Sequence, residues 1–145
     1  MIYITKKDVQ ARIKTDNLEI ITGGDDNLFS SAELDAVNEV SSYLTHNYDT
    51  ALIFQPIETP DFVLNPTIKR IVVDVMLYHL HNSRVNPRQI PENIIQKRDD
   101  AINWLKNVAN PKTQIVADFL PKREFGEKRN NVFAWGSREK RSNTY

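Results

Sequence analysis

The chain has 145 residues, with 19 basic and 19 acidic side chains, a net charge of zero and no cysteine. This length suits one domain with one hydrophobic core, and zero net charge disfavours proteins that coat DNA or anionic membranes through overall charge. The absence of cysteine excludes a disulfide scaffold and a cysteine nucleophile. Apolar runs reach only four residues, against about 18 for a membrane span, and no secretory signal is visible. We therefore expect a soluble intracellular protein without a membrane partner.

A capping signal opens the first predicted helix. Thr5 and Asp8 have the spacing of a capping box, in which each side chain binds the backbone N–H of the other residue. Ile4 and Val9 occupy the positions of the hydrophobic staple that often accompanies such a box. These signals predict a short helix over residues 6–13.

A second capping signal precedes a longer helix. Ser30 and Glu33 form an S-x-x-E box after a turn that is marked by two consecutive glycines. From Val37 to Tyr48, apolar residues recur three and four positions apart, which places them on one face of a helix. We therefore predict a helix over residues 31–48 with a polar outer face.

The third predicted helix is the most apolar. It follows residues 49–65, which contain two prolines and are expected to form a loop that can hold a short β-hairpin. Asn65 is a cap residue and Pro66 suits the first helical position. Apolar residues then cover most of the circumference of residues 66–82, which predicts a central, buried helix. Arg70 and Asp74, four residues apart, are most simply an ion pair on this helix; contact with a neighbouring subunit is the alternative.

The fourth predicted helix spans residues 92–109 and ends at Asn110–Pro111. It carries Trp104, which its spacing places in the core. Together the four helices predict an all-α fold, a small antiparallel helix bundle. The residues expected inside this bundle are Val37, Leu44, Ile71, Val75, Ile102 and Leu105.

Few residues are arranged for chemistry. His79 and His81 are two apart on a helix, so their side chains project about 200° apart and cannot bind the same metal ion. Asp99 and Asp100 also diverge and cannot act as a carboxylate pair. The sequence has no phosphate-binding glycine loop, catalytic-serine motif or metalloprotease motif. We therefore expect no catalytic residues, no metal site, no cofactor and no enzyme activity.

The end of the chain differs from the rest in charge and aromatic content. Residues 1–111 carry 11 basic and 15 acidic side chains, whereas residues 112–145 carry 8 basic and 4 acidic ones and five of the 13 aromatic residues. Disordered segments are usually poor in aromatic residues, and aromatic residues and arginine are enriched where proteins dock. We therefore predict a helical body over residues 1–111 and an extended docking arm over residues 112–145. Its expected partner-binding residues are Phe125, Phe133, Trp135, Arg138, Lys140, Arg141 and Tyr145.

Four stretches of the first 110 residues together resemble one protein family. They are Y-I-T-K-K-D-V at residues 3–9, S-S-Y-L at 41–44, I-K-R-I-V-V-D-V-M-L-Y-H-L at 68–80 and R-D-D-A-I-N-W-L at 98–105. In this order they resemble the head–tail connector proteins of tailed bacteriophages. The long segment 49–65 and the extended tail depart from the short pattern of that family.

The resemblance implies a structural adaptor in the virion, located in the neck between capsid and tail and made in the host bacterial cytoplasm. It implies a homo-oligomeric ring of about twelve copies that binds the portal protein and a neck or tail-completion protein. Genomic DNA would pass through the ring without sequence-specific binding. Such a passage should hold few cations that attract phosphate, which makes Asp25, Asp26 and Asp35 the candidates to face the channel.

A second hypothesis assigns the basic tail to nucleic acid. In this alternative the protein is a nucleic-acid-binding module whose tail cations contact phosphates. Salt would separate the two hypotheses, because phosphate binding by several cations weakens steeply with ionic strength. The cations involved would be Lys122, Arg123, Lys128, Arg129, Arg138, Lys140 and Arg141.

Overall fold

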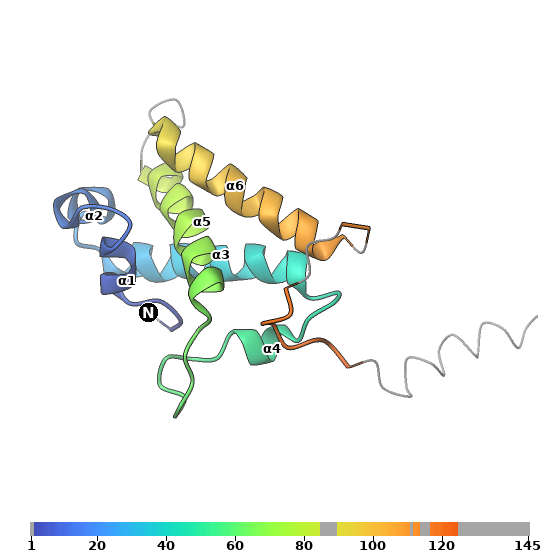
Figure 1. Ribbon diagram of the computed structural model, residues 1–145. Coiled ribbons are helices and arrows are strands. Elements are labelled where there is room, and N and C mark those ends of the chain that lie inside the picture. The colour runs from blue at the N-terminus through green and yellow to red at the C-terminus, as the bar shows by residue number, and fades with distance from the viewer. Residues whose placement is uncertain (1, 85–89, 111, 114–116, 125–145) are drawn as a thin grey trace, which may run out of the picture.

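The computed structural model describes residues 2–84, 90–110, 112–113 and 117–124 (Figure 1). Within these ranges the chain forms six helices and no strand, which confirms the all-α fold. None of the described helices is both long and apolar enough to cross a lipid bilayer. The helices are α1 (Lys6–Gln10), α2 (Thr15–Thr22), α3 (Asp26–Leu44), α4 (Thr50–Ile53), α5 (Pro66–Arg84) and α6 (Glu92–Ala109).

The core lies where α5 meets α3 and α6. Seven consecutive residues of α5, 71–77, are buried, which confirms the prediction of a central helix. Figure 1 shows that α3 lies across α5 and that α6 is antiparallel to α5. The two short helices α1 and α2 lie near the N-terminal end of α3. The six residues predicted to lie inside the bundle are all buried, and Trp104 is half-buried against them.

The first capping box is confirmed, but the helix that follows it is shorter than predicted. The Thr5 hydroxyl accepts a hydrogen bond from the Asp8 N–H, and Asp8 accepts one from the Thr5 N–H at 2.9 Å. α1 ends at Gln10, and the chain then forms α2, which the sequence did not predict. This second helix has no side-chain cap at its start, so it lacks the signal that marked α1.

The predicted Ser30–Glu33 capping box is wrong. α3 begins earlier than predicted, at Asp26, where Asp25 accepts a hydrogen bond from the Asn27 N–H, and it ends at Leu44. Glu33 therefore lies inside the helix, fully buried. Its carboxylate accepts hydrogen bonds of 2.6–3.0 Å from the backbone N–H groups of Ile2, Tyr3 and Ile4, so it fastens the start of the chain to α3.

The segment between α3 and α5 contains one helical turn, and no β-hairpin forms among its residues. Asp49 caps this turn, α4, by accepting hydrogen bonds from the N–H groups of Ala51 and Leu52. The expected start of α5 is confirmed, because Asn65 accepts a hydrogen bond of 2.9 Å from the Thr67 N–H.

The predicted ion pair between Arg70 and Asp74 is also wrong. Asp74 is buried and accepts a two-pronged interaction from the Arg12 guanidinium, with two hydrogen bonds of 2.8 Å and one of 3.1 Å. Arg70 is exposed on the same helix. The turn between α1 and α2 places Arg12 over Asp74, and its planar fork matches the carboxylate better than an exposed neighbour on the same helix could. This pair holds the first two helices against α5.

Candidate functional site

The chain returns to the helical body after α6. Ala117 and Leu120 are buried in the core, and Phe119 stacks on Trp104 of α6 with ring centroids 6.4 Å apart and an angle of 24° between the ring planes. Phe119 itself is half exposed. Residues 117–124, which we call the return segment, therefore belong to the packed body.

Backbone hydrogen bonds fasten the end of the return segment beside the C-terminal end of α3. Lys122 pairs with Tyr48 in an isolated antiparallel bridge. The Asp49 N–H donates to the Pro121 carbonyl at 2.9 Å, and the Arg123 N–H donates to the Asn47 carbonyl at 3.0 Å. These contacts correct the predicted boundary at residue 111 for the described residues: the body includes residues 117–124.

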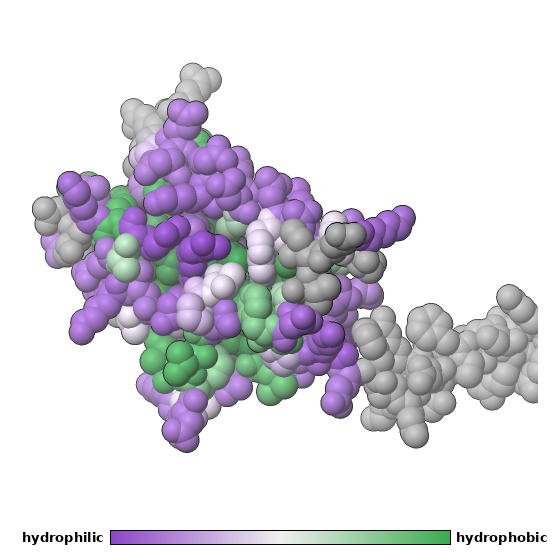
Figure 2. All heavy atoms as spheres, viewed as in Figure 1, coloured by the Kyte–Doolittle hydropathy of each residue, from purple (hydrophilic) through white to green (hydrophobic). Residues whose placement is uncertain are grey.

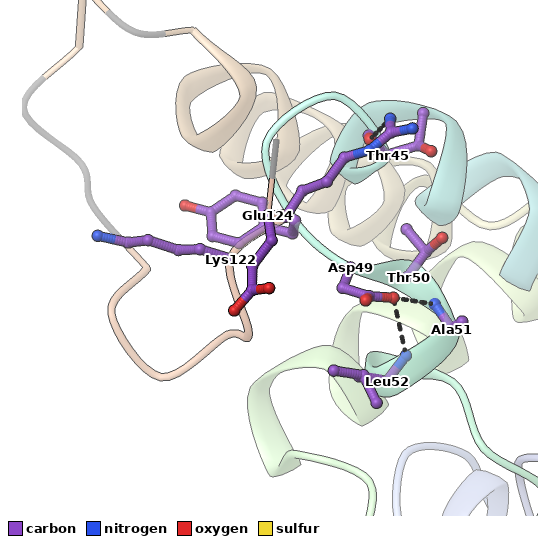
Figure 3. A pocket seen from close by; sticks show the side chains of 9 residues that line it. Thr45, Asp49, Thr50, Ala51, Leu52, Lys122 and Glu124 are labelled. Atoms are coloured by element: carbon purple, nitrogen blue, oxygen red, sulfur yellow. Dashed lines mark hydrogen bonds between the residues drawn. The ribbon is translucent and has the colours of Figure 1, made fainter. Parts of the chain in front are cut away.

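An open pocket of 540 Å³ lies beside this junction (Figure 3). The end of α3, the turn α4 and the return segment all contribute to its wall, and its charged residues are Asp49, Lys122, Arg123 and Glu124. The Asp49 carboxylate is turned to the start of α4, and the Arg123 guanidinium donates to the Thr45 carbonyl at 2.9 Å. Lys122 extends away from Asp49 in Figure 3. The polar groups that line the pocket hold the return segment against the body. The pocket therefore lies at the point where the described part of the return segment ends, at Glu124.

A second group of polar side chains joins the three long helices. Glu39 of α3 accepts a hydrogen bond of 2.6 Å from Arg98 of α6, and its other carboxylate oxygen lies 2.7 Å from His79 Nε2 of α5. The Arg98 guanidinium also lies 4.6 Å from the centroid of the Tyr78 ring, a distance at which the cation is attracted to the ring face. Glu39, His79 and Arg98 are half-buried, and this cluster acts as a cross-link between helices.

The two histidines point to different partners, as their spacing predicts. His79 faces Glu39, whereas His81 is buried and its Nδ1 lies 2.7 Å from the Leu77 carbonyl. Over the described part of the chain, no three His, Asp or Glu side chains come together in a group that could hold a metal ion.

The acidic residues predicted to face a channel are exposed but do not form one cluster. Asp25 caps α3, and Asp26 forms an ion pair of 2.6 Å with Lys6. The hydrogen bond and positive charge of Lys6 hold the pKa of Asp26 below its usual value. Asp35 lies nine residues further along α3, about 13 Å along the helix axis. The structure thus brings Asp25 and Asp26 together with Lys6 and leaves Asp35 apart.

The predicted partner-binding residues, Phe125, Phe133, Trp135, Arg138, Lys140, Arg141 and Tyr145, lie outside the described residues. Sequence reasoning did not find the return segment, the role of Arg12 or the cross-link through Glu39 and Arg98. These contacts join residues more than 55 positions apart, and no local pattern signals such pairs.

The helical body and the return segment packed against it define the class of this chain: it is a small all-α protein. The chain belongs to the bacteriophage Mu Gp36 family, whose family model matches residues 3–131. It is therefore a bacteriophage protein, which confirms the phage origin that the sequence resemblance implied. No curated protein and no solved structure gives a significant match to the chain.

Proposed function

We propose that this protein is a structural adaptor of the phage particle, with no catalytic step and no cofactor. It forms a ring of about twelve copies that joins the portal protein to a neck or tail-completion protein and surrounds the path of the DNA. The observation that carries the proposal is the return segment: residues 117–124 are fastened to the body, so residues 125–145 start from a defined place on its surface. Membership of a phage family supports the setting.

The proposed role of residues 125–145 is to hold a neighbouring subunit or the portal. This stretch of 21 residues can span up to about 70 Å when extended, so reach is no obstacle. Buried aromatic residues carry much of the energy in interfaces, which makes Phe125, Phe133 and Trp135 the proposed anchors. Arg138, Lys140 and Arg141 would pair with acidic groups of the partner, and Tyr145 would add a further aromatic contact.

The proposed DNA-facing surface comes from the acidic part of the body. Asp25, Asp26 and Asp35 are exposed, so they can repel phosphate, although Lys6 offsets part of the charge of Asp26. A surface of this kind would let genomic DNA pass without sequence-specific binding, because exposed carboxylates do not bind phosphate. The protein would then reside in the neck of the virion after synthesis in the host cytoplasm.

Electron microscopy of the full-length protein, alone and mixed with the portal protein of the same phage, tests this function. We expect rings that stack on the portal, with one copy number throughout. A stable two-fold dimer in native mass spectrometry, which persists when portal is added, would contradict the adaptor role. Tight duplex-DNA binding that weakens steeply with salt would instead favour the nucleic-acid-binding alternative.

A further inference from the structure

The segment between α4 and α5 carries an exposed apolar surface. Val63 is 78% exposed, and Ile57 and Ile2 are exposed beside each other, because the Ile57 N–H donates to the Ile2 carbonyl at 2.8 Å. Figure 2 shows hydrophobic residues gathered over this segment. We call Ile2, Ile57 and Val63 the loop surface. Single exposed apolar residues are normal, but several exposed within one short segment and its hydrogen-bonded neighbour favour a contact site.

The surroundings of the loop surface are acidic. Residues 49–65 contain Asp49, Glu58 and Asp61 and no basic residue. Glu58 and Asp61 are exposed within the same loop as Ile57 and Val63. A fitting occupant would therefore combine apolar or aromatic anchors with positive charge.

The C-terminal stretch of this chain has that composition. Residues 125–145 contain four aromatic side chains, five basic ones and two acidic ones, a net charge of +3 against −3 for residues 49–65. The stretch begins next to Glu124, which lines the same pocket as Leu52 of α4. Its length of up to about 70 Å is sufficient to reach the corresponding surface of an adjacent molecule.

We propose that the loop surface of one copy binds residues 125–145 of a neighbouring copy. This inference rests on the proposed adaptor ring, because a head-to-tail contact repeated around an axis closes into a ring. The aromatic side chains cover Ile57 and Val63, and the basic residues pair with Glu58 and Asp61. Each copy then gives one C-terminal stretch and receives another.

Disulfide trapping tests this contact, and the natural chain has no cysteine to interfere. One full-length chain carries Val63→Cys and the other carries Ala134→Cys, which leaves the flanking Phe133 and Trp135 intact. Ile20→Cys on α2 replaces Val63→Cys in the matched control, because Ile20 is 74% exposed and equally apolar. We expect the mixed disulfide of Val63→Cys with Ala134→Cys to form about tenfold faster than the control in concentrated protein, since binding raises the local concentration of the thiols.

Equal rates for Val63→Cys and the Ile20→Cys control would overturn the proposal. A chain with both Val63→Cys and Ala134→Cys that closes only an internal disulfide would overturn it too, by showing that the stretch binds its own copy. Ile57→Glu in the chain that carries Val63→Cys alters the loop surface that receives the C-terminal stretch, so it should slow trapping severalfold. Val63→Glu in the chain that carries Ala134→Cys alters a loop surface that this disulfide does not use, so it should leave trapping unchanged. Rings on the portal without preferential trapping would refute this contact and leave the adaptor function intact. Preferential trapping without binding to the portal would support this contact and contradict the adaptor function.

Discussion

Glu33 shows how one side chain can have a role that its local sequence does not signal. A glutamate three residues after a serine usually caps a helix, yet this one is buried and accepts three backbone N–H groups from the start of the chain. Hydrogen bonds to a charged acceptor are roughly twice as strong as neutral ones. The position of Ile2, Tyr3 and Ile4 against α3 therefore depends on this carboxylate.

Glu33→Gln should lower the free energy of unfolding by about 1–3 kcal/mol, because an amide offers one neutral acceptor where the carboxylate has two charged oxygens. The urea midpoint followed by circular dichroism measures the change. Glu19→Gln, at an exposed position of α2, is the control and should leave the midpoint unchanged. Equal midpoints for both variants would show that the chain start is not held through Glu33.

The lowered pKa of Asp8 predicts that the stability of the protein depends on pH. Burial alone would raise the pKa of Asp8, but the hydrogen bonds from Thr5 and the ion pair of 3.1 Å with Lys69 outweigh it and hold the pKa below its usual value of 3.8. Folding therefore favours the ionised form of Asp8. Its ionisation stabilises the protein at pH values above the usual pKa, and this contribution is lost as the pH falls through the lower pKa of the folded state.

Asp8→Asn should therefore be less stable than the natural protein at neutral pH, and the difference should narrow below about pH 4. Urea unfolding of both proteins over a range of pH measures it. Lys69→Met removes only the ion pair and should reproduce part of the loss. A difference that stays constant into acid would mean that the charge of Asp8 contributes nothing.

The elements differ in how well the sequence predicts them. The long helices α3, α5 and α6 were predicted because each combines a clear apolar face with a proline, glycine or capping boundary. α2 has no side-chain cap, and α4 is a single turn too short to show a period. The return segment was missed because its buried residues, Ala117 and Leu120, are too few to form a pattern.

Trp104 connects α6 with the return segment, so its removal tests this element. Trp104→Ala should cost about 3 kcal/mol, the low end for a large aromatic, because the side chain is half-buried and packs on one face against Phe119. Phe119→Ala should cost less. In a double-mutant cycle the pair should show a coupling of about 0.5–1.5 kcal/mol, measured from urea unfolding. Strictly additive effects would show that the two rings do not stack in solution.

The body and the C-terminal end of the chain differ in packing and in charge. The body buries its apolar residues around α5 and ties distant elements together through Arg12–Asp74, Glu39–Arg98 and the bridge at Tyr48. The positive charge is concentrated at the C-terminal end, while residues 49–65 are acidic. Such an arrangement favours contacts between the end of one copy and the body of another over a uniform attraction to DNA.

Two truncations separate the fold from the proposed assembly. Removal of residues 125–145 should leave helicity and melting nearly unchanged, because it keeps the contacts that Pro121, Lys122 and Arg123 make with the body. It should also abolish binding to the portal. Removal of residues 117–145 should also lower the free energy of unfolding by about 2 kcal/mol or more, since Leu120 leaves the core. Circular dichroism, thermal melting and portal binding of the three proteins measure these effects. If the shorter truncation unfolds the protein, residues 125–145 belong to its core; if it still assembles on the portal, they are dispensable and the proposed role of the C-terminal stretch is wrong.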